Sequence, residues 1–122
     1  MQIIDPATLD LVSRALSAAT MRHGVHASNI ANTNVEGFQP ARVRFEEQLS
    51  HVRESLVRGE PLKLSDLHAV EASLDTTPTA SKIELDSEVA AMSANGLHYQ
   101  ALLKALDKQL GLMSLAISDG RR

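Results

Sequence analysis

The sequence predicts an all-α fold in which long N- and C-terminal helices pair in an extended, coiled-coil-like manner. Apolar residues recur at alternating steps of three and four near both ends of the 122-residue chain, which is the pattern of amphipathic helices. Hydrophobic residues make up 43% of the chain, but only three are aromatic, so the apolar mass is aliphatic and suits thin helical layers. We therefore expect one rod-shaped domain, residues 1–122, with a short third helix and an irregular middle loop.

The N-terminal helix is predicted over residues 6–33, because Asp5 can cap it and Pro6 suits its first position. It would be about 40 Å long at 1.5 Å per residue. Asn32, Asn34 and Gly37 favour turns and end it. Its apolar stripe, interrupted by two histidines, consists of Leu9, Val12, Leu16, Ala19, His23, His26 and Ile30.

The connector, residues 34–80, is predicted to hold a short helix over 43–58 and a flexible loop. The helix rests on steps of four, three and four, and Gly59 with Pro61 would end it. The residues at those steps are Phe45, Leu49, Val52 and Leu56. Residues 60–80 are rich in Pro, Ser and Thr, so this segment is expected to be mobile in the isolated protein.

The C-terminal helix is predicted over residues 81–118, where Ser81 and Glu84 have the spacing of a capping box. Its stripe alternates steps of three and four without a break, and the helix would be about 55 Å long. The stripe consists of Leu85, Val89, Met92, Gly96, Tyr99, Leu103, Leu106, Leu110, Met113 and Ile117. The glycines inside the two helices, Gly24, Gly96 and Gly111, are either tolerated weak points or places where packed helices approach closely.

Two helices of this length cannot form a sphere, and one partner cannot cover all the apolar surface of the second. Further apolar side chains lie off its main stripe, namely Leu97, Leu102, Leu112 and Leu115. Exposed apolar surface of this extent favours association with other chains. The sequence thus predicts self-association or assembly into a larger structure.

Several function classes are disfavoured by composition and by missing motifs. The net charge of −3 gives no basic footprint for nucleic acid, and the absence of cysteine excludes a thiol nucleophile or thiolate metal site. No phosphate loop, nucleophile elbow or zincin motif is present, so we expect no enzyme, no cofactor and no small-molecule substrate. His23 and His26 could hold a metal, but without further ligands nearby they are interpreted as polar interruptions of the stripe.

The first residues, Met1 to Asp10, lack the pattern of a secretory signal, and no stretch reaches the roughly 18 apolar residues of a membrane span. Ordinary rules therefore predict a protein that is not secreted by the general pathway.

Two stretches of the chain resemble the bacterial flagellar rod and hook proteins. The first is Asn29-Ile30-Ala31-Asn32 followed by Val35-Glu36-Gly37-Phe38 and Phe45, and the second is Glu88 to Gln100 with Ala101-Leu102. The second stretch and the short middle are most similar to proximal rod proteins of the FlgB type. Val35, Glu36 and Phe38 stand where that family usually has Thr, Pro and Tyr, whereas Gly37 keeps the position that needs permissive backbone.

This resemblance implies a structural subunit of the flagellar basal-body rod, stacked helically in the periplasm between the membrane-embedded base and the distal rod. It implies partners among other rod proteins, export-gate and base components, and further copies of the chain. It also implies export without a cleaved signal peptide. The implied family-motif residues are Asn29, Ala31, Asn32, Gly37, Phe38 and Phe45. The expected assembly seam is Leu9, Val12, Leu16, Ile30, Leu85, Val89, Met92, Tyr99, Leu103, Leu106, Leu110, Met113 and Ile117.

One alternative stays open at this point. The same helices would suit a cytoplasmic helical-hairpin binding module, or a chaperone of a type III export system, that holds a secreted partner. Without the resemblance, the C-terminal stripe would suit the core of a soluble helical bundle equally well.

Overall fold

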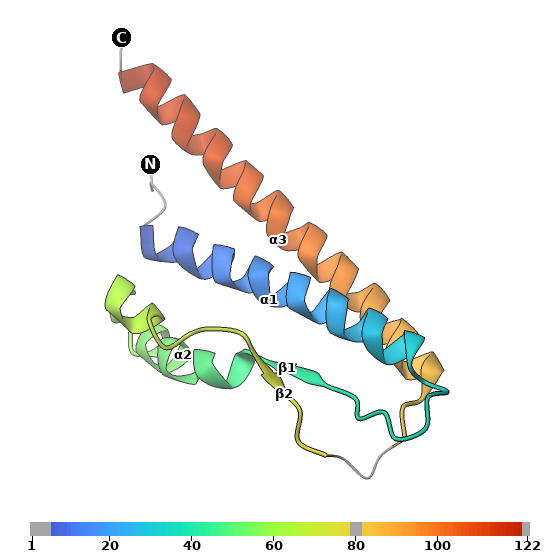
Figure 1. The fold of residues 1–122 in the computed structure, drawn as a ribbon. Helices are drawn as coiled ribbons and strands as arrows, with labels where there is room; N and C mark the ends of the chain where they lie inside the picture. The colour runs from blue at the N-terminus through green and yellow to red at the C-terminus, as the bar shows by residue number, and fades with distance from the viewer. Residues whose placement is uncertain (1–5, 79–81, 121–122) are drawn as a thin grey trace.

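The computed structural model describes residues 6–78 and 82–120, which form three layers (Figure 1). The two long helices, α1 (Pro6–Ala31) and α3 (Leu85–Gly120), run antiparallel side by side, and the middle segment covers the other side of α1. The fold is mostly helical, as predicted, but it also contains a two-stranded sheet, so the all-α description is incomplete.

Helix α1 begins at Pro6 and ends at Ala31, two residues before the predicted end. Its proposed cap, Asp5, lies outside the described residues. The Asn32 backbone amide still donates to the Ser28 carbonyl at 3.1 Å, and the chain then turns, with the Val35 amide donating to the Asn32 carbonyl at 3.0 Å. Gly37 completes the turn with a φ of 79°, which L side chains rarely adopt.

The middle segment contains β1 (Arg42–Arg44), a 3₁₀ turn η1 (Glu46–Leu49), α2 (Ser50–Val57), a second 3₁₀ turn η2 (Leu64–Leu67) and β2 (Ser73–Asp75). The strands pair antiparallel, with Val43 opposite Leu74. The predicted helix over 43–58 is therefore wrong at its start. Residues 42–44 are extended because Val43 turns inward between two exposed arginines, a period of two that belongs to a strand.

The fully buried apolar core lies between α1 and the middle segment, not between the two long helices. It consists of Ala7, Ala18, Phe45, Val52, Leu67 and Val70. Small alanines on α1 let the larger side chains of the middle segment approach its backbone. This core fixes which face of α1 the middle segment covers and leaves the opposite face for α3.

Helix α3 begins at Leu85, and the Glu84 carbonyl accepts the Glu88 amide at 3.0 Å. Glu84 thus stands just before the helix, whereas a capping box needs it at the third helical position. The capping-box prediction is therefore wrong, and its other member, Ser81, lies outside the described residues. Among the described residues, none of the helices has the length and hydropathy needed to cross a membrane.

The glycines inside the long helices are surrounded by open space in this chain. A Cβ atom added at Gly24, Gly96 or Gly111 would meet nothing within 4 Å. Close approach of packed helices at these positions does not occur within the single chain, so here they are weak points of the helix, each costing about 1 kcal/mol relative to Ala.

Candidate assembly interface

A buried asparagine joins all three layers at the inner end of the helix pair. The side chain of Asn29 is on α1, and the residue is only 4% exposed. Its amide donates to the Ala41 carbonyl at 3.1 Å and to Glu88 Oε1 at 2.8 Å, while its Oδ1 accepts the Ala41 amide at 3.3 Å. One side chain therefore pairs with the backbone beside β1, as a strand would, and with the first turns of α3.

His26 shares the same carboxylate. Its Nδ1 lies 2.7 Å from Glu88 Oε1, and both side chains are about one-fifth exposed. Three polar groups from α1 and α3 thus satisfy one another in a site that is largely closed to water. We call Asn29, His26, Glu88 and the Ala41 backbone the inner junction.

A second polar contact holds the helix pair further along. The Asn95 side chain is buried in α3, and its amide donates to the Ala19 carbonyl of α1 at 2.8 Å. Ala19 lies seven residues before His26 in α1, and Asn95 lies seven residues after Glu88 in α3. The two contacts therefore define one antiparallel register, as single buried polar residues do in coiled coils.

Replacing Asn29 tests the inner junction. In Asn29→Leu, the Ala41 amide and carbonyl and Glu88 lose their partner, and each buried polar group left unpaired costs about 1–3 kcal/mol. We expect the free energy of unfolding in urea to fall by about 2–4 kcal/mol. Asn32→Ala is the matched control, because the Asn32 amide donates only to the Ser28 carbonyl on the exposed surface. Equal effects of the two variants would contradict the junction.

The stripe predicted on α3 divides lengthwise in the structure. The row that faces α1 contains Glu88 and Asn95, and the residues at further steps of seven, Leu102, Gln109 and Ala116, are half-buried. Beside it, Met92, Leu106 and Met113 of the expected seam are also half-buried. The remaining seam positions point to solvent: Leu85, Val89, Tyr99, Leu103, Leu110 and Ile117.

The side of α3 that faces α1 is thus partly polar, whereas the row of α3 that points to solvent is apolar. Leu103 is 40% and Leu110 is 47% exposed, whereas Leu97 and Leu115, which are 70% and 61% exposed, lie on a different side of α3. Sets of large apolar side chains in one continuous surface are typical of interfaces with other chains. We call Leu85, Val89, Leu103, Leu110 and Ile117 the outer row.

The remaining predicted residues occupy different places. On α1, Leu9, Val12, Leu16 and Ile30 are half-buried. Of the motif residues not yet described, Phe38 is half-buried, Ala31 is exposed and Phe45 belongs to the core. The structure therefore brings Asn29 into contact with α3 and Phe45 into the core, but places Ala31 in neither.

Sequence reasoning missed Glu88 and Asn95 as contact residues. Both are polar and lie beside the predicted stripe, so a search for apolar periodicity passes over them. A polar residue repeated at a step of seven next to an apolar stripe is the signal that could have found them.

An ion pair ties α1 to the first turn of the middle segment. The Arg22 guanidinium donates to Glu46 Oε2. This hydrogen bond holds the pKa of the Glu46 carboxyl below its usual value of 4.5, although partial burial acts in the opposite direction. The hydroxyl and backbone amide of Thr77, just after β2, likewise lower the pKa of the Asp75 carboxyl at the end of that strand.

The Arg22–Glu46 pair predicts a weak acid dependence of stability. Because the pKa of Glu46 is lower in the folded chain, its contribution is present above about pH 4.5 and is lost as the pH falls through the folded value. The Glu46 side chain is 64% exposed, so the loss is a few tenths of a kcal/mol, within the range of about 0.2–1 for pairs that water screens. Urea unfolding of wild type and Glu46→Gln between pH 3 and 7 measures it. The two curves should converge at low pH, and a constant difference would contradict the assignment.

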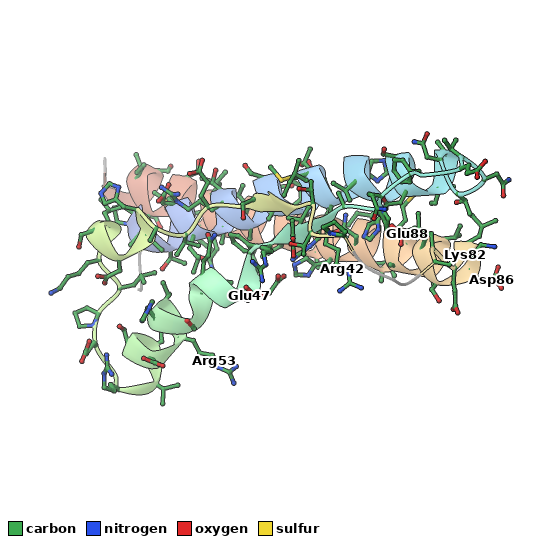
Figure 2. All side chains as sticks on the ribbon, turned by 60° about the horizontal axis from the view of Figure 1, so that its bottom comes forward. Arg42, Glu47, Arg53, Lys82, Asp86 and Glu88 are labelled. Carbon is green, nitrogen blue, oxygen red and sulfur yellow. The ribbon has the colours of Figure 1, made fainter. Side chains whose placement is uncertain are left out.

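A hollow of about 460 Å³ opens beside the inner junction, between α1, β1 and the start of α3. Its acidic side chains have partners: Glu88 in the junction, Asp75 with Arg44 and Thr77, and Glu84 with the Ser87 hydroxyl at 3.3 Å. Two cations at its rim, Arg42 and Lys82, form no ion pair with a described residue. Figure 2 shows Arg42, Lys82 and Glu88 in the same half of the molecule, with Arg53 of α2 away from them.

The histidines expected on the stripe differ in surroundings. His26 is held by Glu88, whereas His23 is exposed. Within residues 6–78 and 82–120, no three His, Cys, Asp or Glu side chains gather in a group that could hold a metal ion.

Comparison with known proteins points to the same family in two ways. The family model described as flagella basal body rod protein matches residues 9–39, the stretch that contains the junction residues of α1. Flagellar basal body rod protein FlgB from Bacillus subtilis is 23% identical over 126 residues, which is 93% of this chain and 95% of the relative. FlgB from Escherichia coli is 28% identical and FlgB from Salmonella typhimurium 27%, each over 89% of this chain and 92% of the relative. The similarity runs through nearly the whole length of every one of these relatives, so both comparisons support a flagellar basal-body rod protein of the FlgB type.

Proposed function

We propose that the chain is a structural subunit of the bacterial flagellar basal-body rod, where it assembles helically with other rod proteins and connects the membrane-embedded base to the distal rod. The observation that carries this proposal is the near full-length similarity to rod proteins. The family is structural, and the chain is not an enzyme. Its role is to contribute to the shape of a polymer.

The pairing of α1 and α3 is proposed to be coiled-coil-like. The matched seven-residue step between the His26–Glu88 and Ala19–Asn95 contacts supports it, because the period of a left-handed supercoil is 3.5 residues per turn. Buried polar residues in such a pair fix its register at some cost in stability.

The predicted seam is proposed to be the surface through which subunits contact one another. Its outer row supports this, since the single chain leaves these large apolar side chains in water, and burial is worth roughly 25 cal/mol per Å². The motif residues Asn29, Asn32 and Gly37 would then act indirectly, by shaping the inner end of the helix pair that presents the seam.

The relatives are proteins of the flagellum basal body, and we take the location of this chain from them. We further propose the periplasmic rod as the site, contacts with export-gate and base components, and delivery through the flagellar export apparatus without a cleaved signal. A chain that polymerises through exposed apolar rows has to be kept from doing so before delivery, which favours transport in an unassembled form.

Purification of basal bodies tests the function. We expect this chain to be recovered in the rod fraction, and mass spectrometry of the recovered chain to find its N-terminal peptide uncleaved. Recovery only in the cytoplasm, in a defined complex with one secreted protein, would overturn the proposal and favour the binding module or chaperone instead.

A further inference from the structure

Asn95 is followed directly by Gly96, which makes it the only asparagine of the chain that precedes a glycine. In an unfolded chain, such a pair deamidates when the glycine backbone nitrogen attacks the asparagine side-chain carbonyl carbon. Glycine favours this attack because it has no Cβ atom to shield its nitrogen and its backbone rotates freely. The other three asparagines, Asn29, Asn32 and Asn34, precede Ile, Thr and Val, whose branched Cβ atoms crowd the nitrogen. Asn95 is therefore the asparagine most open to this reaction when the chain is unfolded.

The reaction exchanges the Asn95 amide for a carboxylate without any change in oxidation state. The Gly96 nitrogen loses its proton to solvent and bonds to Asn95 Cγ, while the bond from Cγ to Nδ2 breaks and Nδ2 takes up a proton and leaves as ammonia. Water then opens the five-membered succinimide ring. Attack at Cγ gives aspartate, and attack at the main-chain carbonyl gives isoaspartate, in which the Gly96 nitrogen stays bonded to Cγ. In sum, one amide and one water give one carboxylate and one ammonium ion.

The folded chain protects Asn95 in two ways. The residue is only 8% exposed, and its Nδ2 donates to the Ala19 carbonyl of α1 at 2.8 Å. Asn95 and Gly96 also lie inside α3, where each backbone N–H donates to the carbonyl four residues before it. Closing the succinimide ring requires the ψ angle of Asn95 to leave the helical value of about −42°. The reaction therefore has to wait until α3 opens locally.

The nitrogen that leaves is the atom through which Asn95 holds α1. After deamidation, a carboxylate oxygen faces the Ala19 carbonyl oxygen, so a donor and an acceptor are replaced by two acceptors at a buried position. Isoaspartate also adds one atom to the main chain inside α3 and interrupts its hydrogen bonds. Either product therefore opposes the pairing of α1 with α3.

We propose that Asn95-Gly96 is a site of spontaneous deamidation that the pairing of α1 with α3 protects and that an unpaired chain exposes. The contact between Asn95 and Ala19 spans 76 residues, so it is absent until a long loop has closed. Deamidation is slow compared with folding, so chains that pair promptly stay intact, whereas chains that remain unpaired are modified irreversibly and are excluded from assembly. The chemistry is independent of the proposed function, and only the exclusion from the rod rests on it.

Incubation of the purified chain at pH 8 and 37 °C, with and without guanidinium chloride, tests the site. Trypsin places Asn95 in the peptide of residues 83–104 and the other asparagines in that of residues 23–42, so one digest compares their rates by mass spectrometry. In denaturant, Asn95 should deamidate at least about ten times faster than each of the others. Without denaturant, its rate should fall at least about tenfold, because the helix has to open first. Equal rates in either comparison would overturn the proposal.

Gly96→Ala separates the reaction from the stability of the helix. A Cβ atom at Gly96 meets nothing within 4 Å, so alanine fits, favours the helix and shields the nitrogen. This variant should deamidate at least about ten times more slowly than wild type in denaturant. Gly111→Ala is the matched control, because it makes the same change at another open position of α3 and leaves Asn95-Gly96 intact. Equal slowing in the two variants would contradict the mechanism.

Asn95→Asp tests the consequence, with Asn34→Asp as its control, because Asn34 is exposed in the turn after α1. Asn95→Asp should lower the equilibrium constant for folding at least about tenfold and be missing from basal bodies, whereas Asn34→Asp should behave like wild type. If Asn95→Asp folds and assembles normally, deamidation does not oppose pairing and the proposal is wrong. If wild type deamidates as expected but never enters basal bodies, the rod function fails while the protected site stands.

Discussion

The double variant Leu103→Asp with Leu110→Asp is expected to abolish assembly while leaving the single chain folded. Both side chains lie in the outer row and are nearly half exposed, so in the monomer the new carboxylates reach water. In an interface, each would be a buried charge without a partner, which costs several kcal/mol. Sedimentation should find only monomers, circular dichroism should find unchanged helix content, and cells that depend on this variant should not swim.

The control for this variant is Ala94→Asp with Ala101→Asp. These exposed residues are also seven apart on α3, on the side opposite the outer row, and add the same charge. We expect normal assembly from them. Equal loss in both pairs would mean that the seam is misplaced. Leu106→Asp is a third comparison, because Leu106 is half-buried beside the row that faces α1, and it should lower both folding stability and assembly.

Phe45→Ala should have the largest effect on folding. Phe45 is 4% exposed in the core between α1 and the middle segment, and removing such a ring costs about 3–5 kcal/mol, a large part of the about 5–15 kcal/mol that stabilises a small domain. Urea unfolding followed by circular dichroism measures the loss. Phe38→Ala makes the same chemical change at a half-buried site outside the core, and it should cost clearly less. Similar losses would contradict the location of the core.

The long helices could be predicted because their signal is local. Pro6 and the residues that follow it repeat the helical period, and the same holds from Leu85 onward. The strands could not be predicted in this way. Each has three residues, and Val43 is extended because it pairs with Leu74, a partner thirty-one positions away that no local pattern reveals.

The sequence likewise could not predict how α3 is rotated about its own axis, that is, which of its sides faces α1. Its apolar stripe indicates which side avoids water, and we expected that side to form the assembly seam. Which side faces α1 is decided by polar contacts, Asn95 with the Ala19 carbonyl and Glu88 with Asn29. Asn29 itself is among the motif residues that the resemblance implies, but its main partner, the Ala41 backbone, carries no side-chain signal.

The inner junction also has a consequence for the order in which the chain can fold. Asn29 and Glu88 are separated by 59 residues, His26 and Glu88 by 62, and Ala19 and Asn95 by 76. Contacts between residues so far apart form slowly, because the intervening loop has to be closed before any of them is made. When the chain emerges with its N-terminus first, α1 therefore cannot pair with α3 until most of the sequence is available. The middle segment can reach α1 earlier, so the half of the molecule that contains Phe45 is expected to form first and the helix pair last.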